Sequence, residues 1–259
     1  MAQLPEHARV VIIGQGGIVG ASVAHHLIEA GWDDIVGLEK SAIPTDIGST
    51  SHASDFCYMT SHDKLNVFTS TYSREFYRAR GNYIEIGGME VARKGDDERM
   101  LELQRKVASG KAFGSNAYMI SAAEAKQKFP LVEEDMIQGA MWDPDAGLVT
   151  PRSQKVAGDL VDEAVESGKL KTFAYTAANK IIVKDGRAVG VETEKGTIMA
   201  DHVVLCAGIW GSLVSQTAGV KLPLMPLEHP LLFFGPWDAL KGTGKDIVYP
   251  LFRDQGNSA

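Results

Sequence analysis

A glycine-rich turn near the N-terminus has a spacing that suits phosphate binding. The β-branched run Val10 to Ile13 leads into it, and its glycines are Gly14, Gly16, Gly17 and Gly20. Glycines let a pyrophosphate approach the backbone N–H groups at a helix N-terminus, because no side chain stands in the way. The turn is longer than the usual G-x-G-x-x-G pattern, which leaves open whether Gly16 or Gly17 faces the phosphates. We expect the turn to bind a dinucleotide; the alternative is a glycine-rich turn without a ligand.

Glu39 follows the turn at the distance expected for an acid that binds ribose. It ends the predicted strand Asp34 to Leu38, close to the offset of about 20 residues seen in dinucleotide-binding folds. A carboxylate in this place accepts hydrogen bonds from both ribose hydroxyls and repels a 2′-phosphate. A solvated glutamate at a strand end is the alternative. The strand, turn, helix and acid together predict a βαβ unit that binds a dinucleotide.

A hairpin in the C-terminal third of the chain favours FAD over NAD. The segment Asp185 to Asp201 has the pattern of a hairpin, and it leads into the apolar run His202 to Cys206 and then into Ala207 and Gly208. This order is similar to that of flavoproteins with a glutathione-reductase-like fold, which place such strands before an Ala-Gly or Thr-Gly pair near the cofactor. An ordinary hairpin is the alternative.

A second group of motifs narrows the resemblance. The most specific is Gly48-Ser49-Thr50-Ser51-His52-Ala53, and the others lie in Ile86 to Val91, Asp143 to Leu148, Ala207 to Gly211 and Pro226 to His229. Over essentially the whole chain these motifs resemble the dimethylglycine and sarcosine dehydrogenase and oxidase branch of the D-amino-acid oxidase-like superfamily. The resemblance implies an α/β fold, with a Rossmann-type, glutathione-reductase-like FAD-binding domain and an inserted α+β substrate domain.

The resemblance also implies an activity and the residues that carry it. Such proteins oxidise the CH–N bond of an N-methylated amino acid by hydride transfer to flavin N5. A histidine matching His52 bonds covalently to the flavin 8α carbon; a histidine that only hydrogen-bonds FAD is the alternative. A histidine matching His229 faces the substrate amine and is the catalytic candidate, since an imidazole accepts a proton near neutral pH; packing between strands is its alternative. Further cofactor-binding positions are Lys40, Ser49, Thr50, Ala207, Gly208 and Trp210.

Other functions are also consistent with these motifs. The same fold serves the oxidation of other small amines and of D-amino acids, and a likeness of fold does not separate these substrates. A catalytically inactive remnant that binds a nucleotide or a partner protein is a further alternative. Oxygen and an electron-transfer protein are both open as electron acceptor. Relatives continue beyond Ala259, where their catalytic tyrosine is expected, so we expect this chain to be truncated at the C-terminus and nearly inactive by itself.

Periodicity and turn residues place the remaining elements. Helices are expected from Leu65 to Phe76, over 97–112, after a capping box at Ser121 and over 153–167. Strands are expected within 83–91, 222–227, 230–234 and 247–251. The expected FAD-binding domain comprises 1–81 and 151–218, and the expected, incomplete substrate domain comprises 82–150 and 219–259.

Composition argues against several classes of protein. The formal net charge is −7 and no basic run stands out, so nucleic-acid binding is not expected, although an anionic substrate stays open. Cys57 and Cys206 give no metal or disulfide pattern and are expected to be buried thiols. No apolar run approaches the roughly 20 residues that span a membrane, and the N-terminus lacks a secretory or transit pattern. We expect a cytosolic protein without a metal, whose partner is a small methylated amine.

Overall fold

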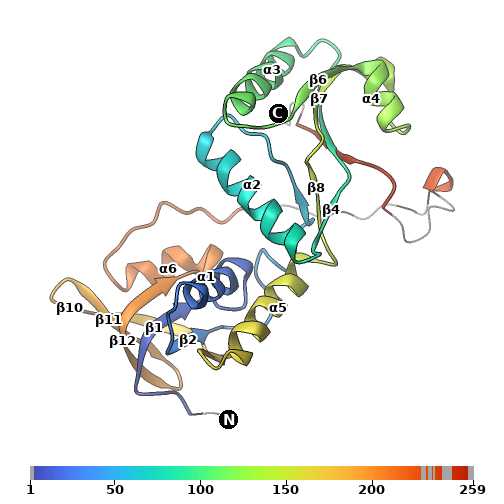
Figure 1. The fold of residues 1–259 in the computed structure, drawn as a ribbon. Helices are drawn as coiled ribbons and strands as arrows, with labels where there is room; N and C mark the ends of the chain where they lie inside the picture. Colours follow the sequence, from blue (N-terminus) through green and yellow to red (C-terminus); the bar gives the residue numbers. More distant parts are fainter. Residues whose placement is uncertain (1–2, 229–231, 233–234, 236, 241–246, 256–259) are drawn as a thin grey trace. The chain divides into compact units, whose positions relative to one another are not determined.

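The computed structural model describes residues 3–228, 232, 235, 237–240 and 247–255. The chain forms two compact units: unit 1 is Met1–Ser54 with Pro151–Leu231, and unit 2 is Asp55–Thr150 with Leu232–Ala259. Figure 1 follows the chain through both of them. The expected first segment of the FAD-binding domain ended at residue 81, whereas the chain leaves unit 1 at Ser54. The reason is that helix α2 (Lys64–Ala79) packs against strand β4 (Tyr83–Glu85) of unit 2.

Among the described residues, unit 1 contains a six-stranded sheet in the order β10-β11-β12-β1-β2-β9. Strands β12, β1, β2 and β9 are parallel neighbours, and β10 and β11 extend the sheet in antiparallel pairing. Their bounds are β1 His7–Ile13, β2 Ile35–Leu38, β9 Leu170–Phe173, β10 Ala178–Lys184, β11 Arg187–Thr193 and β12 Gly196–Leu205. The run Val10 to Ile13 is fully buried in β1, as expected for a parallel strand covered on both faces.

Helices surround the sheet of unit 1 (Figure 1). They are α1 Ile18–Glu29, α5 Ser153–Glu166, the short α6 Gly211–Gln216 and the 3-10 turn η2 Gly208–Trp210. Helices α1 and α5 pack against each other. Val156, Leu160 and Val161 are buried and anchor α5 in the core. This packing fixes the position of the first turn of α5.

The additional residue of the glycine turn is accommodated by burying a side chain. Gln15 is 0% exposed, and its side chain packs against Gly37 of β2, where a Cβ would leave it no room. Among the described residues, neither its amide nitrogen nor its amide oxygen has a hydrogen-bond partner. The longer turn therefore keeps its glycines in place and carries one unsatisfied polar side chain beneath them.

Unit 2 contains, in its described part, a sheet in the order β13-β5-β7-β6 and a smaller sheet in the order β3-β8-β4. The strands not yet given are β3 Phe56–Cys57, β5 Gly88–Arg93, β6 Tyr118–Ser121, β7 Ile137–Asp143, β8 Gly147–Val149 and β13 Leu251–Asp254. The helical elements are α3 Asp97–Ala112, α4 Ala122–Lys128 and the 3-10 turns η1 Glu134–Met136 and η3 Asp238–Leu240.

The helices expected in unit 2 are confirmed. Helix α3 occupies residues 97–112 and buries Leu103 and Val107 against the larger sheet. Helix α4 begins with the expected capping box, in which Ser121 Oγ accepts from Glu124 N while the Glu124 carboxylate accepts from Ser121 N. Helix α2 is also present, but Leu65, Phe68 and Tyr72 are exposed and Val67 is its buried residue.

The Asp143-Pro-Asp-Ala-Gly-Leu segment makes a turn that is held by one carboxylate. Asp143 Oδ2 accepts hydrogen bonds from Met59 N, Thr60 N and Thr60 Oγ1 at 2.9–3.0 Å, and Asp143 Oδ1 accepts from Asp145 N at 3.2 Å. Burial raises the pKa of the Asp143 carboxyl, and these donors partly offset that rise. This motif is thus explained by the architecture of unit 2.

Two groups of expected strands differ in the structure. The second hairpin strand and His202 to Leu205 form one continuous strand, β12, which ends just before Cys206. It pairs with β11 on one side and β1 on the other, and its last residues are only half-buried. The segment 222–227 has no strand, because Pro223 and Pro226 lack the N–H donors that a ladder needs. Of 247–251, only Leu251 belongs to a strand, and 230–234 lies largely outside the described residues.

Candidate functional site

The glycine turn in unit 1 brings three backbone segments into close contact. Gly14 has φ +90°, and a Cβ there would overlap the carbonyl oxygen of Cys206. A Cβ at Gly20 would overlap the carbonyl oxygen of Gly14. Both positions therefore require glycine so that β1, α1 and the end of β12 can meet.

Gly16 and Gly17 have different surroundings. A Cβ on Gly16 would lie 3.0 Å from the Glu39 side chain, whereas the nearest atom to a Cβ on Gly17 is Thr50 Oγ1 at 3.5 Å. Gly17 lines the cavity described below, together with Gly14. The arrangement assigns Gly17 to the ligand side of the turn and Gly16 to close packing with the acid.

Glu39 is buried, with 6% of its surface exposed. Its Oε2 accepts from Gly16 N at 2.9 Å, and its Oε1 accepts from Ser41 N at 3.1 Å and from Ser41 Oγ at 3.3 Å. All three donors are uncharged groups, so none of them neutralises the carboxylate beside the cavity. A carboxylate oxygen accepts more than one hydrogen bond, which leaves acceptor capacity for ribose hydroxyls.

A cavity of about 640 Å³ opens beside the turn, wholly within unit 1. Its volume falls in the range of about 300–1,000 Å³ typical of ligand sites. The predicted positions Lys40, Ser49, Thr50, Ala207, Gly208 and Trp210 all line it. Sequence reasoning did not single out Thr45, Ser153, Thr176, Asn179, Leu213 and Val214, which also line it. These residues come from loops and strand ends that carry no recognisable motif.

The loop from Thr45 to Ala53 forms one wall of this cavity. Thr50 Oγ1 accepts from Ile18 N at 3.0 Å and so satisfies a free N–H group in the first turn of α1. His52 is exposed, and its Nδ1 lies 3.1 Å from the Gly48 carbonyl oxygen. Ser51 Oγ lies 2.9 Å from the same nitrogen, so two contacts within the loop engage Nδ1, and neither involves Nε2.

Lys40 and Trp210 lie together in the cavity wall. The Lys40 Nζ atom is 4.7 Å from the centroid of the Trp210 ring, within the range of a cation–π contact. Trp210 belongs to η2, which directly follows the Ala207-Gly208 pair at the end of β12. The pairing gives this wall an aromatic face and a positive charge.

The predicted catalytic residue and the two thiols stand apart from this description. His229 lies outside the described residues. Cys206 lines the cavity and Cys57 lies in unit 2; both are half-buried rather than fully buried. Burial raises the pKa of both thiols, so neither is activated as a nucleophile near neutral pH.

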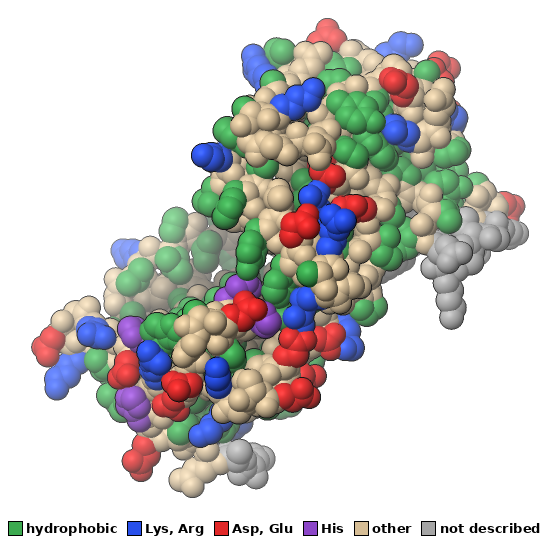
Figure 2. All heavy atoms as spheres, viewed as in Figure 1, with side chains coloured by type: hydrophobic (Ala, Val, Ile, Leu, Met, Phe, Trp, Pro, Cys, Tyr) green, Lys and Arg blue, Asp and Glu red, His purple; other side chains and the backbone are tan. Residues whose placement is uncertain are grey.

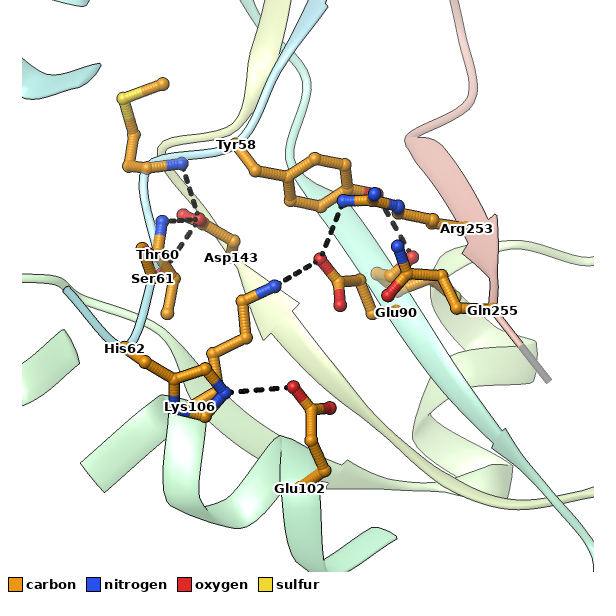
Figure 3. Close-up of polar contacts among 12 residues, drawn as sticks. Tyr58, Thr60, Ser61, His62, Glu90, Glu102, Lys106, Asp143, Arg253 and Gln255 are labelled. Atoms are coloured by element: carbon orange, nitrogen blue, oxygen red, sulfur yellow. Dashed lines mark hydrogen bonds and ion pairs between the residues drawn. The ribbon is translucent and has the colours of Figure 1, made fainter. Parts of the chain in front are cut away.

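A second polar cluster lies inside unit 2 (Figure 3). Glu90 of β5 is 0% exposed. Its carboxylate is 2.7 Å from Lys106 Nζ, 3.1 Å from Arg99 Nη2 and 3.4 Å from Arg253 Nη1. Tyr58 donates to the Met89 carbonyl beside it, and burial raises the pKa of the Tyr58 phenol. These cations tie α3 and β13 to the centre of the larger sheet.

Within the described residues, no group of three or more His, Cys, Asp or Glu side chains could hold a metal ion. None of the helices described is long and apolar enough to cross a membrane. On the face displayed in Figure 2, positive and negative side chains are interspersed rather than gathered into one basic surface.

The parallel sheet, the glycine turn and the buried acid define a Rossmann-like FAD-binding fold. The family model for the FAD dependent oxidoreductases (DAO) matches residues 9–257, and the chain belongs to this family. The residues present fit the cofactor, since Gly14 and Gly17 line an open cavity at the N-terminus of α1 with a carboxylate beside it.

Several known proteins are similar to the chain. One is the mitochondrial pyruvate dehydrogenase phosphatase regulatory subunit of Mus musculus, 32% identical over 244 residues, which covers 91% of this chain and 27% of that protein. Another is the mitochondrial sarcosine dehydrogenase of Mus musculus, 31% identical over 239 residues, covering 87% and 25%. The chain therefore spans about a quarter of these relatives. The crystal structure of L-proline dehydrogenase from P. horikoshii matches with a TM-score of 0.76 and 29% identity, covering 84% of this chain and 57% of that one.

Proposed function

We propose that this chain serves the FAD-dependent oxidation of the CH–N bond of an N-methylated amino acid of the dimethylglycine or sarcosine type. The observation that carries the proposal is the cavity in unit 1, bounded by the glycine turn, the buried Glu39 and the Gly48–Ala53 loop. Relatives named sarcosine dehydrogenase and dimethylglycine dehydrogenase support the choice of substrate class. A small-molecule substrate also agrees with the similarity to L-proline dehydrogenase.

Each part of the cavity has a place in holding FAD. The N-terminus of α1 with Gly14 and Gly17 would take the pyrophosphate, because free N–H groups and the helix dipole favour negative charge there. Glu39 would accept from the adenosine ribose, and the wall formed by Lys40 and Trp210 would take an aromatic ring. When bound, FAD supplies the acceptor for the two electrons that leave the amine.

We place the attachment of FAD at His52 as part of the same proposal. The contacts of Nδ1 with the Gly48 carbonyl and with Ser51 Oγ support it, since they hold the ring by one nitrogen and leave Nε2 as the nitrogen that would bond to the flavin. Acid precipitation of the purified protein tests it directly. Yellow, fluorescent flavin should stay in the protein pellet and should move to the supernatant in His52→Ala. Free flavin from the unaltered protein would refute attachment without refuting FAD binding.

His229 is proposed as the group that accepts the amine proton. This role rests on the Pro226-Leu-Glu-His229 motif alone, because the residue lies outside the described part of the chain. In the natural full-length protein, His229→Ala should lower the rate of flavin reduction by about 10²–10⁴ and flatten the acid limb of the pH–rate profile. An unchanged profile would show that another group holds this proton.

A second candidate function is regulatory rather than catalytic. It is favoured by the similarity to a protein named a phosphatase regulatory subunit. In that case a nucleotide bound in the unit 1 cavity would stabilise the fold, and no amine would reduce a flavin bound there. Release of formaldehyde from dimethylglycine or sarcosine by the natural full-length protein distinguishes the two. D-Alanine and L-proline yield no formaldehyde, so all substrates are compared by reduction of an artificial electron acceptor; a tenfold higher kcat/KM for either would move the substrate away from N-methyl amino acids.

A further inference from the structure

The first turn of helix α5 is connected to the dinucleotide cavity by a chain of hydrogen bonds. Gln154 Nε2 donates to the Thr45 carbonyl oxygen at 2.7 Å, a shorter contact to the cavity loop than those of Ile18 and Arg152. Thr45 is 4% exposed and lines the cavity. Gln154 itself is half-buried and lies behind this wall, outside the set of described residues that line the cavity.

Thr45 passes this contact on in two directions. Its backbone N donates to the Gly16 carbonyl oxygen at 2.9 Å, which ties the loop to the glycine turn. Its Oγ1 lies 3.2 Å from Ser41 Oγ, and Ser41 Oγ lies 3.3 Å from Glu39 Oε1. Since a carboxylate can only accept, the Ser41 proton points to Glu39 and the Thr45 proton points to Ser41. The chain from Gln154 therefore ends on the glycine turn and on Glu39, the two parts of the site proposed to hold the pyrophosphate and the ribose.

The base of this chain is rigid. Helix α5 buries six residues along one side, and Gly158 lets Pro44 of the loop pack at 3.2 Å from where a Cβ would stand. Arg152, the N-cap residue of α5, adds two longer contacts at 3.5 Å to the carbonyl oxygens of Ser51 and Ala53, on either side of His52. Contacts with α5 and its N-cap therefore hold the loop at Pro44, at Thr45 and at Ser51 and Ala53.

We infer that Gln154 is a positioning residue for the cofactor, acting through Thr45 on the glycine turn and on the Glu39 carboxylate without touching the ligand. This inference rests on the proposed binding of FAD in the unit 1 cavity. One neutral hydrogen bond contributes about 0.5–1.5 kcal/mol, which corresponds to a change of about two- to twelvefold in a dissociation constant. Gln154→Met keeps the length of the side chain and removes the donor, so FAD affinity should fall by about three- to tenfold.

The matched control is Gln138→Met. Gln138 is also half-buried and its Nε2 also donates to a backbone carbonyl, that of Arg93 at 3.2 Å, but it lies on β7 of unit 2. This variant should leave FAD affinity within about twofold. All variants are compared in the His52→Ala background, where flavin binds reversibly, and ADP serves as a second probe because it contains the groups expected at Glu39 and at the turn.

A double-mutant cycle with Glu39→Gln separates positioning from general weakening. Residues in one hydrogen-bond network give non-additive effects, whereas independent sites add. Gln154→Met should therefore raise the FAD dissociation constant three- to tenfold when Glu39 is intact, and less than about twofold when it is combined with Glu39→Gln. An unchanged dissociation constant, or the same factor in both backgrounds, would overturn the inference.

Arg152→Gln keeps the inference testable if Gln154→Met does not fold. Because Arg152 is exposed, this change should be tolerated; it should speed amide hydrogen exchange in residues 46–53 and weaken FAD by about twofold. Unchanged exchange and affinity would overturn the role of α5 in holding the cavity loop. If the parent protein binds neither FAD nor ADP, the proposed function fails together with the inference. If the parent protein binds FAD, and Glu39→Gln weakens that binding while Gln154→Met does not, only the inference fails.

Discussion

Two buried glutamates, one in each unit, show how an acid proposed to bind a ligand differs from an acid that supports the fold. Glu39 is held by two backbone N–H groups and one hydroxyl, and it lines a cavity. Glu90 is 0% exposed and is held by two lysine or arginine groups at 2.7–3.1 Å, with a third at 3.4 Å. Uncharged donors fix a carboxylate but leave its charge available, whereas cations neutralise it within the protein. Burial alone therefore does not identify a functional acid. Uncharged partners do so only beside a cavity, since buried Asp143 is also held by uncharged donors and supports the fold.

The largest expected effect is loss of flavin after a substitution in the glycine turn, which tests the proposed ligand site of unit 1. Gly14→Val would place a branched side chain on the Cys206 carbonyl oxygen, beside the proposed pyrophosphate site. We expect purified Gly14→Val to contain no detectable flavin in its absorbance spectrum. Gly31→Val is the matched control, because Gly31 has φ +85° with no atom within 4 Å of a Cβ. It should lose only about 1–2 kcal/mol of stability from backbone strain and keep its flavin; full flavin in Gly14→Val would mean that the turn is assigned wrongly.

The next effect tests the structural acid. Glu90→Gln keeps the shape of the side chain but leaves Lys106 and Arg99 without their buried counter-charge. Removing one partner of a buried ion pair typically costs about 3–5 kcal/mol, and we expect a loss of that size in urea unfolding. Glu102→Gln is the control, since that carboxylate is 37% exposed and also pairs with Arg99, and exposed pairs contribute about 0–1 kcal/mol. Equal losses for the two variants would contradict a structural role for Glu90.

The same substitution at Glu39 tests the acid that is proposed to bind the ligand. Glu39→Gln removes a charged acceptor at the cavity rim, and hydrogen bonds to charged groups contribute about 1.5–3 kcal/mol. In the His52→Ala background, fluorescence titration should show FAD affinity lowered by about 10- to 100-fold. The same titration of Glu90→Gln should show no change beyond about twofold. If Glu90→Gln weakened FAD as much as Glu39→Gln does, the distinction between the two acids would be lost.

The smallest effect concerns the buried amide beneath the turn. Among the described residues Gln15 has no partner for either amide atom, and an unsatisfied buried polar group costs about 1–3 kcal/mol. Gln15→Met has nearly the same volume without the polar atoms, so it should raise the free energy of unfolding by about 1 kcal/mol. Guanidinium unfolding of the flavin-free protein measures this. A loss of stability would indicate that the amide is satisfied, for example by an internal water.

The sequence predicted those parts of the site that depend on local chemistry. Spacing located the glycine turn and the acid after the second strand, and the resemblance located the Gly48–Ala53 loop; residues from all three lie in the cavity wall. Spacing did not decide between Gly16 and Gly17, because both are glycines and only the position of Glu39 separates them. The roles of Thr45 and Gln154 depend on contacts between segments more than a hundred residues apart, which one sequence without such a motif does not reveal.

The same contrast holds for the fold. Helix α3 and the capping box of α4 follow from local periodicity and local hydrogen bonds, and both were predicted. The segment 222–227 has the apolar composition of a strand, but its two prolines cannot join a ladder. The apolar positions on α2 predicted a helix but not its buried side, because burial depends on which neighbour arrives. The cytosolic location and the roles of His52 and His229 stay predictions.

Anaerobic mixing of the natural full-length protein with excess dimethylglycine or sarcosine tests the central claim most directly. The visible flavin absorbance is followed in a stopped-flow instrument, with glycine as the non-methylated control. The account predicts that the oxidised flavin bleaches with either methylated amino acid and bleaches far more slowly, or not at all, with glycine. A flavin-loaded protein that keeps its colour with both methylated substrates would contradict the proposed oxidation and would favour the regulatory alternative.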